Sequence, residues 1–142
     1  MGEKIRVLIV DDHALFRSGV KSLLQRHPEF EVVDVAGHGL EGVKRAKFLK
    51  PDVVLLDINM PGIPGLDALR LIVEEVPETH VLMLTVSEDA EDLMETLRGG
   101  AAGYLVKNIE TEALVDAIRR AAAGESVVSL QMTAKLVQGV RG

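Results

Sequence analysis

The sequence predicts an open, doubly wound α/β domain with a five-stranded parallel sheet and helices on both faces. Two observations lead to this fold class. Five short apolar runs alternate with five segments that carry apolar residues at helical spacing. The runs are apolar at consecutive positions, as is typical of strands that are buried on both faces of a parallel sheet.

The first half of the chain is expected to contain three strands and two helices. The strands are Ile5–Val10, Val32–Val35 and Val53–Leu56. The apolar stripes of the two intervening helices comprise Phe16, Val20, Leu23 and Leu24, and then Leu40, Val43, Ala46 and Leu49. The second helix is expected to end before Pro51, because proline cannot continue a helix.

The second half is expected to contain two more strands, Val81–Leu84 and Gly103–Val106. The stripes of the remaining helices comprise Leu66, Leu69, Ile72, Val73 and Val76, then Leu93, Met94 and Leu97, then Leu114, Val115, Ile118, Ala121 and Ala122. Asp89 is expected to cap the middle one of these helices. Pro77 and Gly124 mark the ends of the other two.

The helical pattern weakens after Gly124, and this divides the chain. Residues 1–124 are expected to form one domain. Residues 125–142 are expected to form a linker, or one further short helix that Ser129 caps and that runs through Leu130, Leu136 and Val137.

Composition excludes several classes of protein. The 142 residues include no cysteine, which predicts no disulfides and suits a reducing cytoplasm. The apolar runs are too short to span a membrane, and the N-terminus does not have the layout of a signal peptide. The net charge of −6 argues against a nucleic-acid-binding face on this domain, because such faces depend on Lys and Arg.

Three acidic residues follow predicted strands at the edge where open α/β sheets place their sites. Asp11 and Asp12 follow the first strand, and Asp57 follows the third. If these strands are neighbours, the carboxylates converge, and Mg²⁺ is the hard cation that such oxygen ligands suit. The alternative is that Asp11 and Asp12 only cap the following helix.

Two more strands end in groups that suit phosphoryl chemistry. Thr85 places a hydroxyl after the fourth strand, and Lys107 places an ammonium after the fifth. A phosphoryl group on the Asp57 carboxylate would need its charge balanced by metal, hydroxyl and ammonium groups. Taken singly, Thr85 is more often an ordinary strand residue and Lys107 a solvated surface charge, so the prediction depends on the whole set.

As an ordered set, these residues resemble the receiver domains of bacterial two-component response regulators over about residues 5–123. The motifs are Val10-Asp11-Asp12-His13, Leu55 to Gly62 around Asp57, Thr85, and Gly103-Tyr104-Leu105-Val106-Lys107. The resemblance implies a flavodoxin-like fold with strand order 2-1-3-4-5.

The resemblance also implies a role for each site residue. Asp57 would accept a phosphoryl group from a sensor histidine kinase, and Lys107 would pair with the phosphoryl oxygens. Mg²⁺ would be bound by Asp12 and Asp57 directly, by Asp11 through water and by the backbone carbonyl of Asn59. Thr85 would swing towards the phosphoryl group, and the aromatic residue Tyr104 would become buried when Thr85 moves.

The motifs are most similar to those of the NarL/FixJ (LuxR-type) subfamily, whose members usually carry a helix-turn-helix domain after the receiver. The sequence ends before such a domain, so it is either part of a longer protein or a natural single-domain regulator, and its linker-like tail favours the former. The subfamily implies transcriptional control through that absent DNA-binding domain and a possible homodimer on phosphorylation. It implies no enzymatic turnover beyond self-phosphorylation and autodephosphorylation.

Two other functions were weighed. A phosphatase that forms an aspartyl phosphate, similar to the haloacid dehalogenase group, would need an acid two residues after Asp57, where this chain has Asn59. A degenerate receiver that only binds partners would not need the complete set of site residues.

Two further signals were set aside. The segment Gly37–Gly42 matches a dinucleotide-binding pattern but follows the second strand, so we interpret its glycines as permitting a tight turn. His13 lies beside the predicted site and is interpreted as a surface residue.

Overall fold

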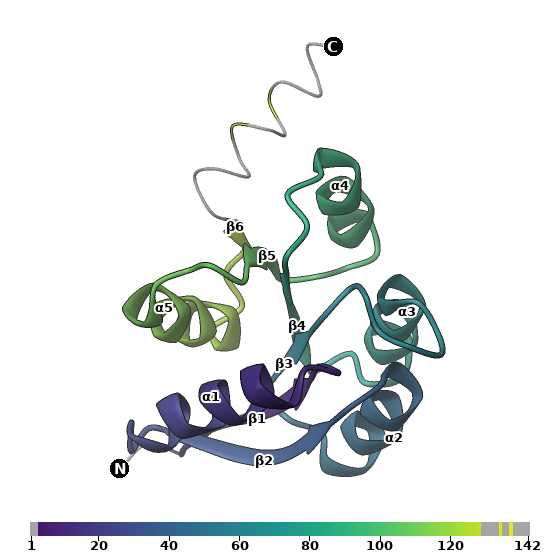
Figure 1. The fold of residues 1–142 in the computed structure, drawn as a ribbon. Coiled ribbons are helices and arrows are strands. Elements are labelled where there is room, and N and C mark those ends of the chain that lie inside the picture. Colours follow the sequence, from purple (N-terminus) through teal and green to yellow (C-terminus); the bar gives the residue numbers. More distant parts are fainter. Residues whose placement is uncertain (1–2, 129–133, 135–136, 138–142) are drawn as a thin grey trace.

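A computed structural model of the chain describes residues 3–128 together with residues 134 and 137. Its elements alternate along the chain, as Figure 1 shows. They are β1 (Ile5–Val10), α1 (Ala14–Gln25), β2 (Phe30–Ala36), α2 (Gly39–Leu49), β3 (Val53–Leu56), α3 (Gly65–Glu75), β4 (His80–Thr85), α4 (Ala90–Arg98), β5 (Gly103–Val106), α5 (Thr111–Ala122) and β6 (Val127–Val128). The predicted doubly wound α/β class is confirmed.

The strands form one parallel sheet in the order β2-β1-β3-β4-β5-β6. The expected order of the first five strands is confirmed, but the sheet has six strands and not five. The sixth strand was missed because Val127 and Val128 alone are too short to give a periodic signal. This strand lies within the segment expected to be a linker.

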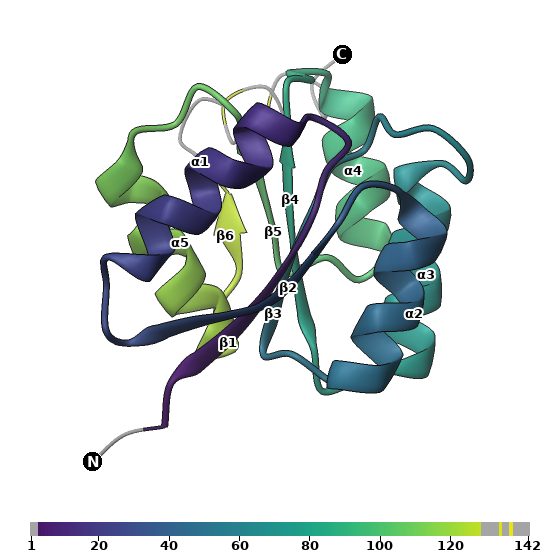
Figure 2. The same ribbon diagram turned by 60° about the horizontal axis from the view of Figure 1, so that its bottom comes forward.

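Helices cover both faces of the sheet, with α1 and α5 on one side and α2, α3 and α4 on the other (Figures 1 and 2). Alternate strand residues point into two separate cores. Leu8 and Val10 pack with α2, α3 and α4, whereas Val7 and Ile9 pack with α1 and α5. Burial on both faces is the physical reason for the consecutive apolar residues.

The observed helix and strand ends differ from the predicted ones by a few residues. β2 runs from Phe30 to Ala36 and β4 from His80 to Thr85, so each is longer than its apolar run. Asp89 caps α4 as predicted, since its side chain accepts a hydrogen bond from the backbone nitrogen of Glu91 at 2.9 Å. Of the short helix expected after Ser129, the structure describes residues 134 and 137, which are both helical; Ser129, Leu130 and Leu136 lie outside the described residues.

Gly39 and Gly42 of the Gly37–Gly42 segment are closely packed against neighbouring side chains. A β-carbon at position 42 would lie 2.7 Å from the Val10 side chain, and one at position 39 would lie 2.8 Å from Ile63. None of the three glycines in this segment has a positive φ, so their backbone conformation is one that other residues could also adopt. Gly42 thus lets α2 approach β1 closely at Val10, the residue before Asp11, and Gly39 lets the start of α2 approach Ile63.

Within the part of the chain that the structure describes, every helix is too short or too polar to cross a membrane.

The close approach of β6 to β5 gives a first prediction. A β-carbon at position 103 would lie 2.1 Å from the carbonyl oxygen of Val127, which is backbone and has little room to move. We expect Gly103→Ala to displace β6 and to lower the free energy of unfolding by about 1–3 kcal/mol, the usual cost of overpacking. Urea unfolding monitored by circular dichroism measures this change.

The matched control is Gly19→Ala. This position lies in α1 with no atom within 4 Å of an added β-carbon, so the substitution should raise stability by about 0.5–1 kcal/mol through helix propensity. Equal stabilities for Gly103→Ala and the wild type would contradict the packing argument.

Candidate functional site

The candidate site lies at the carboxyl edge of the sheet, where β1 and β3 end side by side. Val10 pairs with Leu56 as the last residue of each strand, and the backbone nitrogen of Asp57 donates to the Val10 carbonyl at 3.1 Å. This pairing brings the residues that follow the two strands together. The expected convergence of Asp11 and Asp57 is therefore confirmed by the sheet order.

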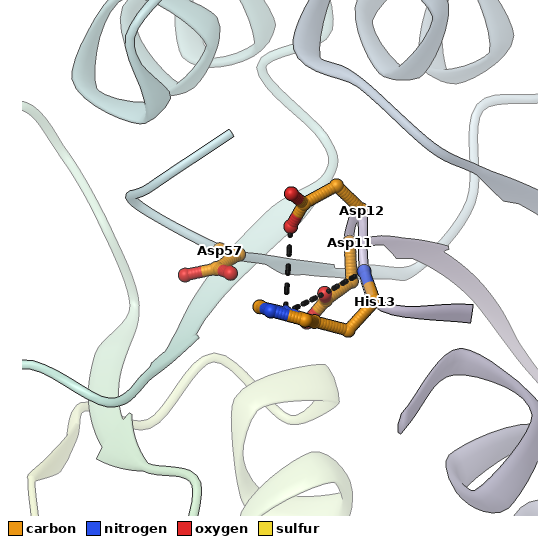
Figure 3. Close-up of side chains that lie close together, drawn as sticks. All are labelled: Asp11, Asp12, His13 and Asp57. Atoms are coloured by element: carbon orange, nitrogen blue, oxygen red, sulfur yellow. Dashed lines mark hydrogen bonds and ion pairs between the residues drawn. The ribbon is translucent and has the colours of Figure 1, made fainter. Parts of the chain in front are cut away.

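Figure 3 shows Asp11, Asp12, His13 and Asp57 gathered around one point. Each of the four residues offers one atom that could bind a cation, and these atoms lie within 4.8 Å of one another. The side chains differ in exposure: Asp11 and Asp57 are 2% and 3% exposed, whereas Asp12 and His13 are exposed. The cluster thus has a buried floor of two carboxylates and a solvent-facing rim.

The Lys107 ammonium compensates the charge of the two buried carboxylates. Its Nζ lies 2.6 Å from Oδ2 of Asp11 and 3.1 Å from Oδ2 of Asp57. Burial disfavours the charged ammonium, but the hydrogen bonds and charges of Asp11 and Asp57 outweigh it, and the pKa of Lys107 is raised above its ordinary value. The ring of Phe16 lies 4.5 Å from Nζ and adds a cation–π contact.

His13 belongs to the cluster more closely than the sequence indicated. It is exposed, as predicted, but its Nδ1 lies 3.3 Å from Asp11, 3.4 Å from Asp12 and 3.4 Å from the Lys107 ammonium. The sequence did not indicate these contacts, because His13 has no second histidine near it at a spacing typical of metal ligands.

The structure does not favour the alternative role of Asp11 and Asp12 as helix caps. His13 is the N-cap residue of α1, and its side chain makes no capping hydrogen bond. The Asp11 carboxylate accepts a hydrogen bond from the backbone nitrogen of His13 at 2.8 Å, which orients this carboxylate before the helix begins. The side chains of Asp11 and Asp12 are therefore directed to the site and not to the helix.

Asn59 contacts Asp57 through its backbone, so this contact does not depend on the Asn59 side chain. The backbone nitrogen of Asn59 donates to Oδ1 of Asp57 at 3.3 Å. Together with the Lys107 ammonium on Oδ2, this bond occupies both oxygens of the Asp57 carboxylate. The carboxylate is thereby fixed in orientation at the floor of the site.

Thr85 and Tyr104 are both hydrogen-bonded to Ser87. Thr85 is buried at the end of β4, and its hydroxyl accepts a hydrogen bond from the backbone nitrogen of Ser87 at 3.3 Å. Tyr104 is also buried, and its hydroxyl donates to the Ser87 carbonyl at 2.8 Å. Burial raises the pKa of Tyr104, partly offset by the Ser87 bond, and nearby carboxylates including Asp92 raise it further.

The donor set of the cluster fits a hard divalent cation. Three carboxylates supply oxygen atoms, and one of them, Asp12, faces solvent, so that an entering ion can keep several of its waters. Mg²⁺ prefers such oxygen ligands and retains water, whereas closed sites of nitrogen and sulfur ligands suit other metals. Asp11, Asp12 and Asp57 are the residues that could hold it.

A doubly wound parallel sheet with an acidic cluster and a lysine at its carboxyl edge defines the class of receiver-like domains. The sequence comparison agrees: the response regulator receiver domain family matches residues 7–119. The chain therefore belongs to the response regulator receiver domain family, and its relatives place it in the NarL/LuxR-type group.

Two curated relatives illustrate this placement. The nitrate/nitrite response regulator protein NarL of Escherichia coli K12 is 40% identical over 98% of this chain and 64% of its own length. The transcriptional regulatory protein DegU of Brevibacillus brevis is 38% identical over 97% of this chain and 58% of its own length. The chain thus spans about 60% of the length of these relatives.

Solved structures agree with the fold. A LuxR-family two-component response regulator from Aurantimonas sp. SI85-9A1 superposes with a TM-score of 0.92 at 27% identity, covering 99% of this chain and all of the other. The response regulator domain of Thermotoga maritima CheB superposes with a TM-score of 0.79 at 37% identity, covering 85% of this chain and 98% of the other.

The position of Lys107 predicts a pH-dependent stability. Lys107→Met leaves two buried carboxylates without their cation, so we expect the free energy of unfolding at pH 7 to fall by about 3 kcal/mol. Because the pKa of Lys107 is higher in the folded state than its ordinary value of 10.5, the charged lysine contributes its full stabilisation at pH values below 10.5. This contribution is lost as the pH rises through the higher pKa of the folded state. The difference between wild type and variant should therefore be constant from pH 7 to 9 and narrow above pH 10.5.

Urea unfolding in EDTA across this pH range measures the effect. The matched control is Lys44→Met, which removes an exposed ammonium from α2 and should change stability little at any pH. A difference that widens in alkali would contradict the assignment of Lys107 as the compensating charge.

Proposed function

We propose that Asp57 is the phosphoacceptor of a Mg²⁺-dependent signalling switch. The observation that carries this proposal is the state of the Asp57 carboxylate, which is 3% exposed, bonded at both oxygens and adjacent to two further carboxylates. A carboxylate in this position has a fixed orientation for nucleophilic attack. The Lys107 ammonium beside it, and a cation held by the neighbouring carboxylates, would balance the incoming charge.

In the proposed reaction, a carboxylate oxygen of Asp57 attacks the phosphorus of a phosphohistidine on a sensor histidine kinase. A P–O bond forms, the P–N bond breaks, and the kinase imidazole leaves with the electron pair and takes up a proton from solvent. Lys107 pairs with the phosphoryl oxygens while it remains close to Asp11. When bound by Asp11, Asp12, Asp57 and the Asn59 carbonyl, Mg²⁺ supplies positive charge to the transferring group.

The acylphosphate then acts on Thr85. The Thr85 hydroxyl accepts a hydrogen bond from the Ser87 backbone nitrogen, and turning it towards a phosphoryl group on Asp57 would change this bond. Tyr104 is buried in the structure, and its hydroxyl is bonded to the same loop that Thr85 contacts. In this chain the signal therefore starts with Thr85 and the loop after β4.

The whole protein is proposed to work as a bacterial transcription regulator in the cytoplasm. The relatives named above are regulators that are longer than this chain, which supports a DNA-binding domain C-terminal to the receiver. Phosphorylation would control that domain and favour a homodimer. The domain itself would turn over only its own phosphoryl group, without acting as an enzyme on other substrates.

Phosphoryl labelling tests the acceptor. Incubation with acetyl phosphate and Mg²⁺ should add one phosphoryl group to the wild type, and intact mass spectrometry should show the addition. Asp57→Asn should remain unlabelled because it lacks the nucleophilic oxygen. Asp67→Asn, an exposed carboxylate in the first turn of α3, is the matched control and should be labelled normally.

The labelling result also distinguishes the proposed phosphoacceptor from the alternative function, a degenerate receiver. Normal labelling of Asp57→Asn would refute Asp57 as the acceptor. No labelling of any variant would favour a degenerate receiver that binds partners without phosphorylation.

Metal binding gives a second test. At a free Mg²⁺ concentration ten times the dissociation constant, binding to the folded state should raise the free energy of unfolding by about 1.4 kcal/mol. Asp12→Asn should lose most of this gain because it removes a charged ligand at the rim, and Asp67→Asn should retain it. Thermal unfolding with and without Mg²⁺ is the measurement, and equal gains for all three proteins would contradict a metal site at this cluster.

A further inference from the structure

His13 contacts the carboxylates of the candidate site but has no task in the proposed phosphoryl transfer. Figure 3 shows its ring beside Asp11 and Asp12, with Nδ1 3.3 Å from Oδ1 of Asp11 and 3.4 Å from Oδ1 of Asp12. The main chain holds this position, because the backbone nitrogen of His13 donates to the same Oδ1 of Asp11 at 2.8 Å. One nitrogen and two oxygen atoms from three consecutive residues therefore meet in the site.

The neighbours of the His13 ring make opposite demands on its Nδ1 atom. The Lys107 ammonium lies 3.4 Å away and needs an acceptor, whereas the two carboxylate oxygens need a donor. A protonated Nδ1 would face the ammonium, and an unprotonated Nδ1 would face two anionic oxygens. A metal cation bound by Nδ1 and both oxygens removes this conflict, since all three atoms then act as its ligands. Lys107 keeps its bonds to Asp11 and Asp57 through their Oδ2 atoms.

The spacing of these ligand atoms matches tetrahedral coordination. Ligands of a tetrahedral Zn²⁺, with bonds of about 2.0–2.1 Å, lie about 3.3–3.4 Å from one another. Ligands of an octahedral Mg²⁺ with similar bond lengths lie only about 2.8–3.0 Å apart. The observed distances of 3.3 and 3.4 Å from Nδ1 agree with the tetrahedral value. His13 and Asp12 are exposed, so water has access to a fourth position.

The chemistry of the three ligands indicates which cations they bind. An imidazole nitrogen suits Zn²⁺ and its neighbours in the first transition row, whereas Mg²⁺ prefers oxygen ligands. A site with one imidazole and two carboxylates also resembles catalytic zinc sites in its ligand types, with three protein ligands and an open fourth position. The oxygen ligands of the site therefore serve both kinds of cation, and His13 favours the transition metal.

We propose that Asp11, Asp12 and His13 form a mixed nitrogen and oxygen site for a transition-metal dication of the Zn²⁺ class, which competes with Mg²⁺. This inference deepens the proposed function and rests on it in one respect, that Mg²⁺ also uses Asp11 and Asp12. Because these ligands are shared, the two cations exclude each other. The free concentration of the transition metal thereby sets how much of the domain is open to Mg²⁺.

Cobalt titration of the full chain tests the site directly. Co²⁺ replaces Zn²⁺ in tetrahedral sites, where it absorbs visible light much more strongly than in octahedral ones. The chain contains no cysteine, so no thiolate competes for the metal. Visible absorption during titration with Co²⁺ gives its dissociation constant, and displacement of Co²⁺ by Zn²⁺ or by Mg²⁺ gives theirs.

Two histidine variants form a matched pair. His13→Asn removes the imidazole from the N-cap of α1, and His38→Asn does the same at the exposed N-cap of α2. Asparagine is a good N-cap residue, so both helices keep a suitable first residue. Its side-chain oxygen also leaves His13→Asn with a donor that suits Mg²⁺. Asp12→Asn, which lowers the charge of a shared ligand, is the third variant.

In the wild type and in His38→Asn, Co²⁺ should produce the strong tetrahedral absorption, and Mg²⁺ should abolish it only in large excess over Zn²⁺. In His13→Asn, the dissociation constants of Co²⁺ and Zn²⁺ should rise at least about tenfold, since even the loss of a group that only supports a ligand costs this much. The dissociation constant of Mg²⁺ should change less than about twofold. Asp12→Asn should weaken the binding of all three cations.

The outcomes separate this inference from the proposed function. Equal Co²⁺ and Zn²⁺ affinities in the wild type and His13→Asn would overturn the site. An equal loss in His38→Asn would overturn it as well, because it would indicate adventitious binding at exposed histidines. Neither result would affect the labelling of Asp57. A wild type that binds Zn²⁺ through His13 but does not bind Mg²⁺ would refute the Mg²⁺-dependent switch and leave the transition-metal site standing.

Discussion

The placement of one ammonium between two buried carboxylates is the constraint on which the rest of the site depends. At about 4 Å, two like charges repel by roughly 4 kcal/mol at an effective dielectric constant of 20. Asp11 and Asp57 nevertheless lie together at the floor of the site, because Lys107 bonds to both. The compensation leaves Asp12 at the rim, where its carboxylate faces solvent and an entering cation. Without Lys107, the charges of these two acids would be left for a bound cation alone to balance.

The sheet order decides which strand ends meet at this site. β1 lies between β2 and β3, so Asp11 and Asp57 follow adjacent strands although forty-six positions separate them in the sequence. β5 lies two strands from β3, and the length of the Lys107 side chain is what carries its ammonium back to Asp57. Close packing supports the arrangement, since Gly42 lets α2 approach β1 and Gly65 lets α3 begin against the backbone of Asp57 and Ile58.

The loop after β4 connects this electrostatic centre to the surface of the domain. Thr85 borders the site, whereas Tyr104 and the first turn of α4 lie on the far side of Ser87. The hydrogen bonds around Ser87 are local and directional, in contrast to the apolar packing of the sheet. A rearrangement can therefore begin in the hydrogen bonds of this loop, as a switch between two packings requires.

The sequence by itself determined the fold class and most of the site. Consecutive apolar runs predict buried parallel strands, and the acids, the threonine and the lysine each follow a run directly, so Asp11, Asp57, Thr85 and Lys107 could be assigned to one edge of the sheet. These features are local, and local patterns are readable from one chain. Only the tertiary structure decided the rest, because it depends on contacts between distant residues. The sixth strand exists through the pairing of Gly103 with Val127. Lys107 brings its ammonium to His13 and the carboxylates from the far end of the chain, and Tyr104 is buried in the core on the α2, α3 and α4 side of the sheet.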